Sequence, residues 1–273
     1  MLSGVRTDVS AFAETPDPHR HRVQFCAGDQ PLINDVSGYL AAGIANGDGL
    51  LVIATPEHNA AFAQALRELS ADVDPALHHR QLLFADASQT LKRFLVDGRP
   101  DWRKFERTMD ALLSEIHPRS ELAGMRAYGE MVGLLWKADQ FSEAVSLEQM
   151  WNRLIGNNGF ELFCSYPIDI LTGNADMAVL EPLLCAHTEV ISAHPNGNLK
   201  TALDRAIEEV LGAEAPEVRA LLNADQHPGW PAMAEAEAFI LNLRSRIPSR
   251  ADEILARARR YEHTPEIASD RVQ

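Results

Sequence analysis

The most informative carboxylate in the sequence is Glu130. It directly follows a short apolar run that ends at Gly129, and apolar residues resume at Met131. Because burying an unpaired carboxylate is costly, Glu130 needs a partner or a position at an edge open to water. We expect a buried strand that ends at Gly129, with Glu130 just past its C-terminal end, where ligands bind in open α/β sheets. The structural alternative is a glutamate that caps the next helix or pairs with an arginine such as Arg126.

Other side chains with useful chemistry follow predicted strands in the same way: Asp29, His58, Asp86 and Tyr166. Since the carboxyl ends of parallel strands meet at one edge of a sheet, these side chains and Glu130 could line one pocket. A purely structural alternative applies to Asp86 and Glu57. Each could simply place negative charge at the N-terminus of the helix that follows it.

Several catalytic and metal-binding motifs are missing. The turn over residues 26–33 has one glycine, no lysine and no serine or threonine, and Asp29 puts negative charge where a phosphate would sit. Pro31 removes an amide donor from the same turn. No G-x-S-x-G motif occurs, and the ten histidines show no H-x-x-x-H spacing. We therefore predict no catalytic residue, no metal site and no cofactor.

The elements that must position these side chains can be read from hydrophobic periodicity. Residues 22–69 read as strand, helix, strand, helix, which is the repeating unit of a parallel sheet. Further strands are predicted over 81–86, 125–129 and 159–166, with helices over 102–116, 141–155 and 177–188. Asp29 is a candidate N-cap for the first helix, and Gly47 a candidate C-terminal stop. This pattern predicts an α/β fold with a mostly parallel sheet flanked by helices.

After about residue 195 only helical patterns remain, over 199–211, 216–222, 231–247 and 249–261. We expect an α/β domain over 20–195, a helical appendage over 197–263, and flexible ends over 1–19 and 264–273. The last predicted helix has a basic face formed by Arg250, Arg257, Arg259 and Arg260. That face is either solvated or packed against acidic segments of the same chain or of a partner.

Composition narrows the class of protein. The net charge of −14 argues against direct nucleic-acid binding as the main purpose. The three cysteines form no C-x-x-C pair, no N-terminal apolar signal segment is visible, and no run of about 18 apolar residues occurs. We therefore expect a cytoplasmic protein with no membrane contact. Cys164 lies in an apolar run and is expected to be an inert core residue.

Several motifs occur together in order along the chain. The first is His21-x-Val23-x-Phe25, followed by Val52-Ile53-Ala54-Thr55-Pro56-Glu57-His58 and by Asp86-Ala87-x-x-Thr90-Leu91. The most distinctive are Tyr128-Gly129-Glu130-Met131-Val132 and Leu147-Glu148-x-x-Trp151-Asn152, and Ser165-Tyr166-Pro167, Cys185 and His187 complete the set. Over about residues 20–192, the sequence resembles the MEDS domain, the sensory domain named for methanogens, methylotrophs and the dichloromethane-responsive repressor.

The resemblance implies a fold similar to the RecA/KaiC-like ATPases, typically without a working phosphate loop. It also implies a sensor of small molecules of the kind found in bacterial transcription regulators and histidine kinases. The motif positions carried over as candidate ligand-binding residues are Asp29, His58, Asp86, Glu130, Glu148 and Trp151. For Trp151, its helical spacing with Leu147 and Leu154 favours the core instead. Residues 197–273 show no clear helix-turn-helix and no kinase catalytic motif, so neither output activity is expected.

Three functions remain open at this point. The first is a non-catalytic signalling protein whose α/β domain binds a small molecule or a regulatory protein at the C-terminal strand edge. The second is a divergent KaiC-like nucleotide-binding protein, an ATPase, or a hydrolase that uses Glu130 with Asp86 or His58. The third is an interaction module that regulates a kinase or a transcription factor. Each of these could act as a homo-oligomer.

Overall fold

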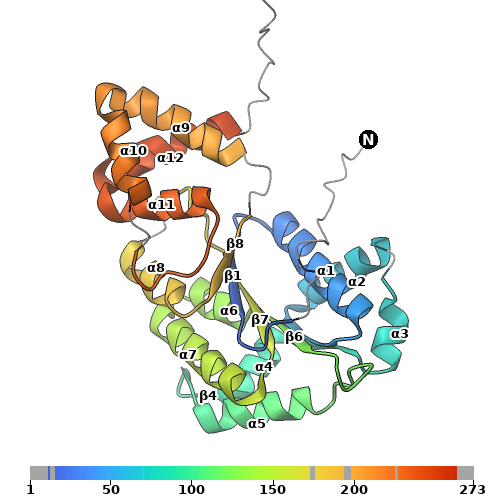
Figure 1. Cartoon of the computed structure of the whole chain (residues 1–273). Helices are drawn as coiled ribbons and strands as arrows, with labels where there is room; N and C mark the ends of the chain where they lie inside the picture. The colour runs from blue at the N-terminus through green and yellow to red at the C-terminus, as the bar shows by residue number, and fades with distance from the viewer. Residues whose placement is uncertain are drawn as a thin grey trace, which may run out of the picture.

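The computed structural model describes residues 12, 16–69, 71–172, 176–193, 198–224 and 227–262. An α/β body is followed by a group of C-terminal helices (Figure 1). The flexible ends predicted over 1–19 and 264–273 fall almost wholly outside the described residues, apart from Phe12 and residues 16–19. The junction expected between the α/β domain and the helical appendage, at residues 195–197, lies outside them too.

The body is built on one sheet of parallel strands. Their order across the sheet is β3-β2-β6-β7-β1-β8, and every neighbouring pair is parallel. The predicted α/β class with a parallel sheet is therefore confirmed. The strand bounds are β1 (His21–Phe25), β2 (Gly49–Ala54), β3 (Leu82–Asp86), β6 (Met125–Gly129), β7 (Glu161–Tyr166) and β8 (Glu189–Ile191).

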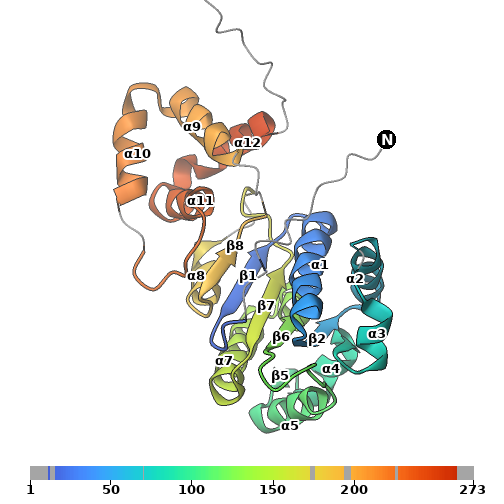
Figure 2. The ribbon, with the colours of Figure 1, turned by 45° about the vertical axis from the view of Figure 1, so that its right-hand side comes forward.

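Helices cover both faces of the sheet (Figures 1 and 2). Strand β2 shows why, because it is apolar and buried along its whole length, as a strand covered on both sides must be. Its Leu50 and Val52 belong to the core beneath one helical layer, whereas Leu51 and Ile53 belong to the core on the other face. The first layer holds α1 (Asp29–Asn46), α2 (Pro56–Glu68) and α3 (Val73–His78). The second holds α4 (Ala87–Phe94), α5 (Trp102–Leu113), α6 (Met131–Lys137), α7 (Phe141–Asn158) and α8 (Met177–Leu184).

Two local predictions were wrong. The helix expected over 177–188 ends at Leu184 as α8, and the chain then forms β8, which was not predicted. Strand β8 has only three residues, too few for a periodic signal, and it is held by its pairing with β1. Asp29 is not the N-cap of α1 but its first residue, with Gly28 as the cap and no side-chain capping bond. A small hairpin formed by β4 (Leu95–Val96) and β5 (Arg99–Pro100) also precedes α5.

The predicted C-terminal helical region is present. It comprises α9 (Asn198–Leu211), a short 3₁₀ turn (Gly212–Glu214), α10 (Ala215–Ala224), α11 (Glu235–Arg246) and α12 (Pro248–Glu262). The basic face of α12 packs against acids of the same chain, one of the two arrangements expected for it. Arg259 pairs with Asp169 at 2.8 Å, and Arg257 pairs with Glu209 at 3.2 Å.

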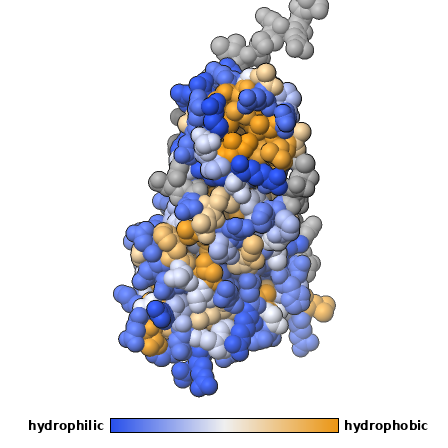
Figure 3. All heavy atoms as spheres, turned by 90° about the vertical axis from the view of Figure 1, so that its left-hand side faces the viewer, coloured by the Kyte–Doolittle hydropathy of each residue, from blue (hydrophilic) through white to orange (hydrophobic). Residues whose placement is uncertain are grey.

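Apolar side chains also gather on one face of the upper, helical part of the molecule (Figure 3). Leu221 of α10, which is 45% exposed, is one of the large apolar side chains that this region presents to solvent. Within the described ranges, no helix has the length and apolar character needed to cross a bilayer.

Candidate functional site

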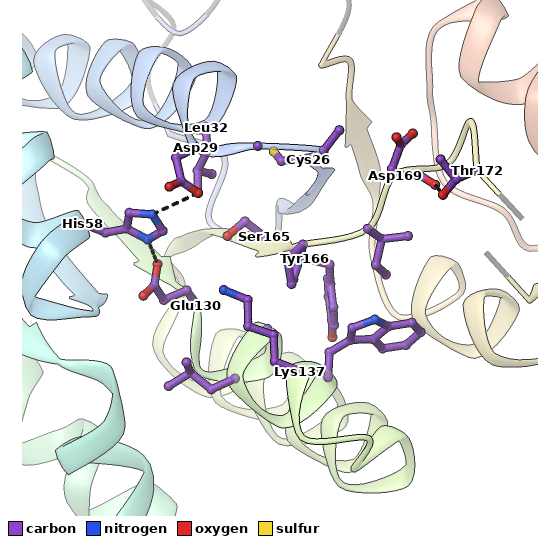
Figure 4. Close-up of a pocket in the computed structure, with 17 residues that line it drawn as sticks. Cys26, Asp29, Leu32, His58, Glu130, Lys137, Ser165, Tyr166, Asp169 and Thr172 are labelled. Atoms are coloured by element: carbon purple, nitrogen blue, oxygen red, sulfur yellow. Dashed lines mark hydrogen bonds and ion pairs between the residues drawn. The ribbon is translucent and has the colours of Figure 1, made fainter. Parts of the chain in front are cut away.

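The carboxyl ends of β1, β6 and β7 surround a cavity of about 410 Å³. The first turn of α1, helix α6 and the segment after β7 complete its walls (Figure 4). The cavity therefore lies at the sheet edge where ligands bind in open α/β folds. Its lining residues are Cys26, Ala27, Gly28, Asp29, Leu32, His58, Glu130, Gly133, Leu134, Trp136, Lys137, Ser165, Tyr166, Pro167, Ile168, Asp169 and Thr172.

A chain of three side chains, joined by one hydrogen bond and one ion-pair contact, crosses one side of the cavity (Figure 4). The Nδ1 atom of His58 lies 2.6 Å from Oε2 of Glu130, and its Nε2 lies 3.6 Å from Oδ1 of Asp29. These residues come from the starts of α2, α6 and α1, so three separate strand–helix connections meet at this point. The backbone N–H of Thr55 donates to Oε1 of Glu130 at 2.5 Å, which uses the second carboxylate oxygen. Glu130 is therefore well partnered although it is buried.

Neither structural alternative for Glu130 describes its contacts. Its side chain makes no capping bond to α6. Arg126 pairs with Asp48 instead, at 2.8 Å and in full burial. On its inner side, Glu130 lies 3.4 Å from the hydroxyl of Tyr128, which in turn is 2.7 Å from Oγ of Ser165. The carboxylate thus faces His58 and the cavity.

The structure separates the predicted site residues into two groups. Asp29, His58, Glu130 and Tyr166 line the cavity. The others do not: Asp86 caps α4 by accepting from the N–H of Gln89 at 2.9 Å, Trp151 is 1% exposed in the core, and Glu148 is fully buried behind the cavity wall.

Lys137 was not predicted as a site residue, yet its side chain reaches into the cavity (Figure 4). Lys137 lies seven residues after Glu130, which is close to two turns of α-helix, so α6 carries both to the same side. That spacing was the signal available in the sequence. Ser165 also lines the cavity and was likewise not singled out as a ligand contact, whereas Trp136, one of four tryptophans considered as ligand-stacking groups, does line it.

The protonation states around the cavity differ. The hydrogen bond to Glu130 raises the pKa of His58 above its ordinary value, against the opposing effect of partial burial, and the charges of Glu130 and Asp29 add to the increase. The raised pKa therefore favours the protonated, cationic form of His58. Burial raises the pKa of the Cys26 thiol, and the nearby acids Asp35 and Asp29 reinforce that effect, so Cys26 faces the cavity as a neutral thiol.

Replacing Glu130 with glutamine should lower the pKa of His58 relative to the unmodified protein. Because the folded-state pKa of His58 lies above the unfolded value of about 6.5, the pair stabilises the fold below that pH, and this stabilisation is lost as the pH rises through the folded pKa. NMR titration of the imidazole and urea unfolding across pH 5–8 would measure both effects. Glu57→Gln, in the exposed first turn of α2, is the matched control and should leave both unchanged. An unchanged His58 pKa in Glu130→Gln would contradict the assigned pairing.

Behind the wall formed by Tyr166 lies a buried group of potential metal ligands: His21, Glu148, Cys164 and His187. Their donor atoms all lie within 4.8 Å of one another. The Tyr166 hydroxyl donates to Oε1 of Glu148 at 2.6 Å and so connects this group to the cavity. Burial and the neighbouring His187 lower the pKa of His21, and burial raises the pKa of the Cys164 thiol.

A comparison with protein families gives one match. Residues 20–188 match the family described as MEDS: MEthanogen/methylotroph, DcmR Sensory domain, and these residues form well over half of the chain. The chain belongs to the MEDS family. The resemblance expected from the motifs is thereby confirmed. A comparison with curated proteins finds no match.

Membership of the MEDS family gives the protein a sensory, signalling role. The matched residues hold all strands of the sheet except β8, together with the lining of the cavity. The C-terminal helices lie beyond the matched range. The family match of this MEDS protein therefore covers most of the α/β body.

Proposed function

We propose that this protein is a non-catalytic sensor that binds a small organic molecule in the cavity beside Glu130. The supporting observation is the cavity itself, which lies at the carboxyl edge of the sheet and combines apolar walls with a few polar groups. Small-molecule sites typically have this composition and a volume of roughly 300–1,000 Å³.

The lining favours a ligand with an apolar body and one anionic or hydrogen-bonding end. Leu32, Leu134 and Trp136 supply apolar surface. The charge of His58 is already balanced by Glu130 and Asp29, whereas Lys137 presents a second cationic group to the cavity. We therefore expect the ammonium of Lys137 to contact the polar end of the ligand, with Ser165 as a neutral partner.

The residues around the cavity give less support to nucleotide binding or hydrolysis. The exposed carboxylate of Asp29 occupies the first turn of α1, where a phosphate would need an electropositive helix end. Pro31 follows in the same turn and offers no amide hydrogen. The Cys26 thiol that faces the cavity is protonated and is a weak nucleophile. These features favour binding over hydrolysis and leave the ATPase as the alternative.

The segment after β7 connects the cavity to the C-terminal helices. Asp169 and Thr172 line the cavity, and Arg259 of α12 pairs with Asp169 at 2.8 Å. Arg244 of α11, itself buried, donates to the carbonyl oxygen of Ile170 at 2.8 Å and to that of Thr172. A ligand that moves this segment would therefore act directly on α11 and α12. We propose that this is how occupancy is reported, because a ligand can shift a protein only through differential contacts with two states.

Replacing Arg244 with methionine should uncouple the two parts. The variant loses both bonds to the 170–172 segment while keeping most of the aliphatic packing volume. We expect ligand affinity within about threefold of the unmodified protein, on the order of 0.6 kcal/mol, but no ligand-dependent change in hydrogen exchange in α11, whereas α12 keeps its link to the segment through Arg259 and Asp169. Arg103→Met, on the exposed surface of α5, is the control. Full ligand-dependent protection of α11 in Arg244→Met would contradict the proposed route.

The ligand itself is best sought by thermal shift. The panel should contain small carboxylic acids, alcohols, chlorinated hydrocarbons and ATP with magnesium. We expect stabilisation by an apolar compound with a polar end, and loss of affinity by about tenfold in Lys137→Met, since a charge-assisted bond contributes roughly 1.5–3 kcal/mol. Stabilisation by ATP with magnesium alone, with ATP hydrolysis that disappears in Glu130→Gln, would support the ATPase instead.

A second candidate function is recruitment of a regulatory protein through the helical region. The apolar face in Figure 3 supports it, because contiguous exposed apolar surface often marks an interaction site. The partner would be a kinase, a transcription regulator or a second copy of this chain. Sedimentation of the unmodified protein would detect self-association, and Leu221→Asp, at an exposed apolar side chain of α10, would test whether that helix takes part in it.

A further inference from the structure

The four buried ligand atoms behind Tyr166 come from distant parts of the chain. His21 opens β1, Glu148 lies on α7, Cys164 lies on β7, and His187 follows α8. All four side chains are nearly or fully inaccessible to solvent. Polar groups buried together in this way need partners that satisfy them, and the group is too deep for water to do so freely.

Four of the distances between donor atoms lie in the range of the edges of a coordination tetrahedron, with Glu148 reaching the two imidazoles through different carboxylate oxygens. Nε2 of His21 lies 3.3 Å from Oε2 of Glu148 and 3.4 Å from Sγ of Cys164. Nε2 of His187 lies 3.4 Å from Oε1 of Glu148, and Sγ of Cys164 lies 3.7 Å from Oε2. With zinc–nitrogen and zinc–oxygen bonds of about 2.0–2.2 Å and a zinc–sulfur bond of about 2.3 Å, tetrahedral edges are roughly 3.3–3.7 Å.

Hydrogen bonds outside the group orient both imidazoles. The side-chain amide of Asn152 donates to the carbonyl oxygen of Ala186 at 2.7 Å, so its Oδ1 is an acceptor for Nδ1–H of His21 at 2.9 Å. Nδ1 of His187 lies 2.7 Å from the carbonyl oxygen of Leu183, which can only accept. In the neutral tautomer that each of these hydrogen bonds selects, Nε2 carries a lone pair directed into the group. Metal-ligating histidines are typically oriented by outer hydrogen bonds of this kind.

One atom of the group lacks a well-formed hydrogen bond. Nε2 of His187 is buried and has only the 3.4 Å contact with Oε1 of Glu148, which does not form a hydrogen bond, although the ring is held firmly from the other side. Charge leads to the same conclusion, because a divalent cation with the Cys164 thiolate, the Glu148 carboxylate and two neutral imidazoles gives a neutral centre. A neutral centre is far less costly to bury than an isolated carboxylate.

We propose that His21, Glu148, Cys164 and His187 bind a zinc ion in a closed, structural site. Binding replaces the proton of the Cys164 thiol with a sulfur–zinc bond, and that proton is released to solvent. Four protein ligands leave no open position for substrate, so the role is structural and not catalytic. The ion ties together β1, β7, α7 and the segment after α8. Through the Tyr166–Glu148 bond, it also fixes the wall of the cavity.

The site is tested with the full-length protein, produced in zinc-supplemented medium and purified without chelators. Elemental analysis should give about one zinc per chain. After removal of the metal, titration with cobalt(II) should produce the visible bands of tetrahedral cobalt and a thiolate charge-transfer band, with release of one proton. Neither the zinc content nor cobalt binding depends on the sensory ligand. A negative result in both would therefore exclude the zinc site without contradicting the proposed sensor function.

Cysteine variants identify the sulfur ligand. In a Cys26→Ser/Cys185→Ser double variant, Cys164 is the sole remaining cysteine, and the charge-transfer band should persist unchanged. Cys164→Ser should lose the band, and Cys185→Ser, two residues from His187 but exposed, should keep it. If Cys164→Ser does not fold, the double variant still decides the assignment. The proposal would be overturned by protein that contains no zinc and takes up no cobalt, or by loss of the band in the double variant. The buried group would then be held together by shared protons and not by a metal.

Discussion

Replacing Arg126 with leucine should lower the free energy of unfolding by about 3–5 kcal/mol. The guanidinium of Arg126 lies 2.8 Å from the carboxylate of Asp48, and both side chains are at most 2% exposed. Asp48 also accepts from the backbone N–H of Gly124 at 3.0 Å, so it is fixed in place and cannot turn toward water. The leucine variant would leave a buried, uncompensated carboxylate. Urea unfolding followed by circular dichroism at neutral pH would measure the loss.

An exposed ion pair in the same protein provides the control. Arg67 lies 2.8 Å from Asp74, the same distance as in the buried pair, but the two side chains are 53% and 76% exposed. Arg67→Leu should cost less than about 1 kcal/mol, because solvent already screens such pairs. Equal losses in the two variants would show that the Arg126–Asp48 pair is not sequestered from water.

Replacing Trp151 with alanine should also lower the free energy of unfolding by about 3–5 kcal/mol, because the substitution leaves a large cavity in the core. Trp151 is 1% exposed, and its ring meets that of Phe105 edge to face at a centroid distance of 5.0 Å. Since Trp151 does not line the cavity, the folded variant should keep its affinity for the ligand. Denaturant unfolding, together with ligand titration well below the midpoint, separates the two effects.

Trp136 is the matched control for that experiment. It lines the cavity, is only partly buried, and lies 5.7 Å from the ring of Tyr166. Trp136→Ala should therefore cost less stability than Trp151→Ala but weaken ligand binding. The opposite pattern, with binding lost in Trp151→Ala and retained in Trp136→Ala, would show that the ligand lies elsewhere.

The sequence predicts the sheet edge well, since the evidence there is local. The apolar run before Glu130 marks a strand end, other apolar runs mark β2, β3 and β7 in the same way, and mixed alternation marks β1. Parallel pairing then brings Asp29, His58, Glu130 and Tyr166 to one edge without further information. Asp86 follows the same rule but lies on β3 at the far side of the sheet, and strand order is not visible in local periodicity.

The buried group behind Tyr166 could not be predicted from spacing. His21 and Glu148 lie far apart in the sequence. They meet in the structure because β1 pairs with β7 and α7 packs on that face of the sheet. Glu148 was singled out only by its motif, and Cys164 was expected to be inert core, whereas the two lie 3.7 Å apart in one polar group. A motif based on short sequence spacing cannot report contacts that the sheet register creates.

The central claim is that the cavity beside Glu130 binds a small organic ligand. The most direct test is NMR of protein with labelled histidine and tryptophan side chains, titrated with the compound that gives the largest thermal shift. The account predicts saturable shifts of the His58 ring and the Trp136 indole, with the Trp151 indole unchanged. Shifts confined to residues outside the cavity, or saturation of the Gly28 turn by ATP with magnesium, would contradict it.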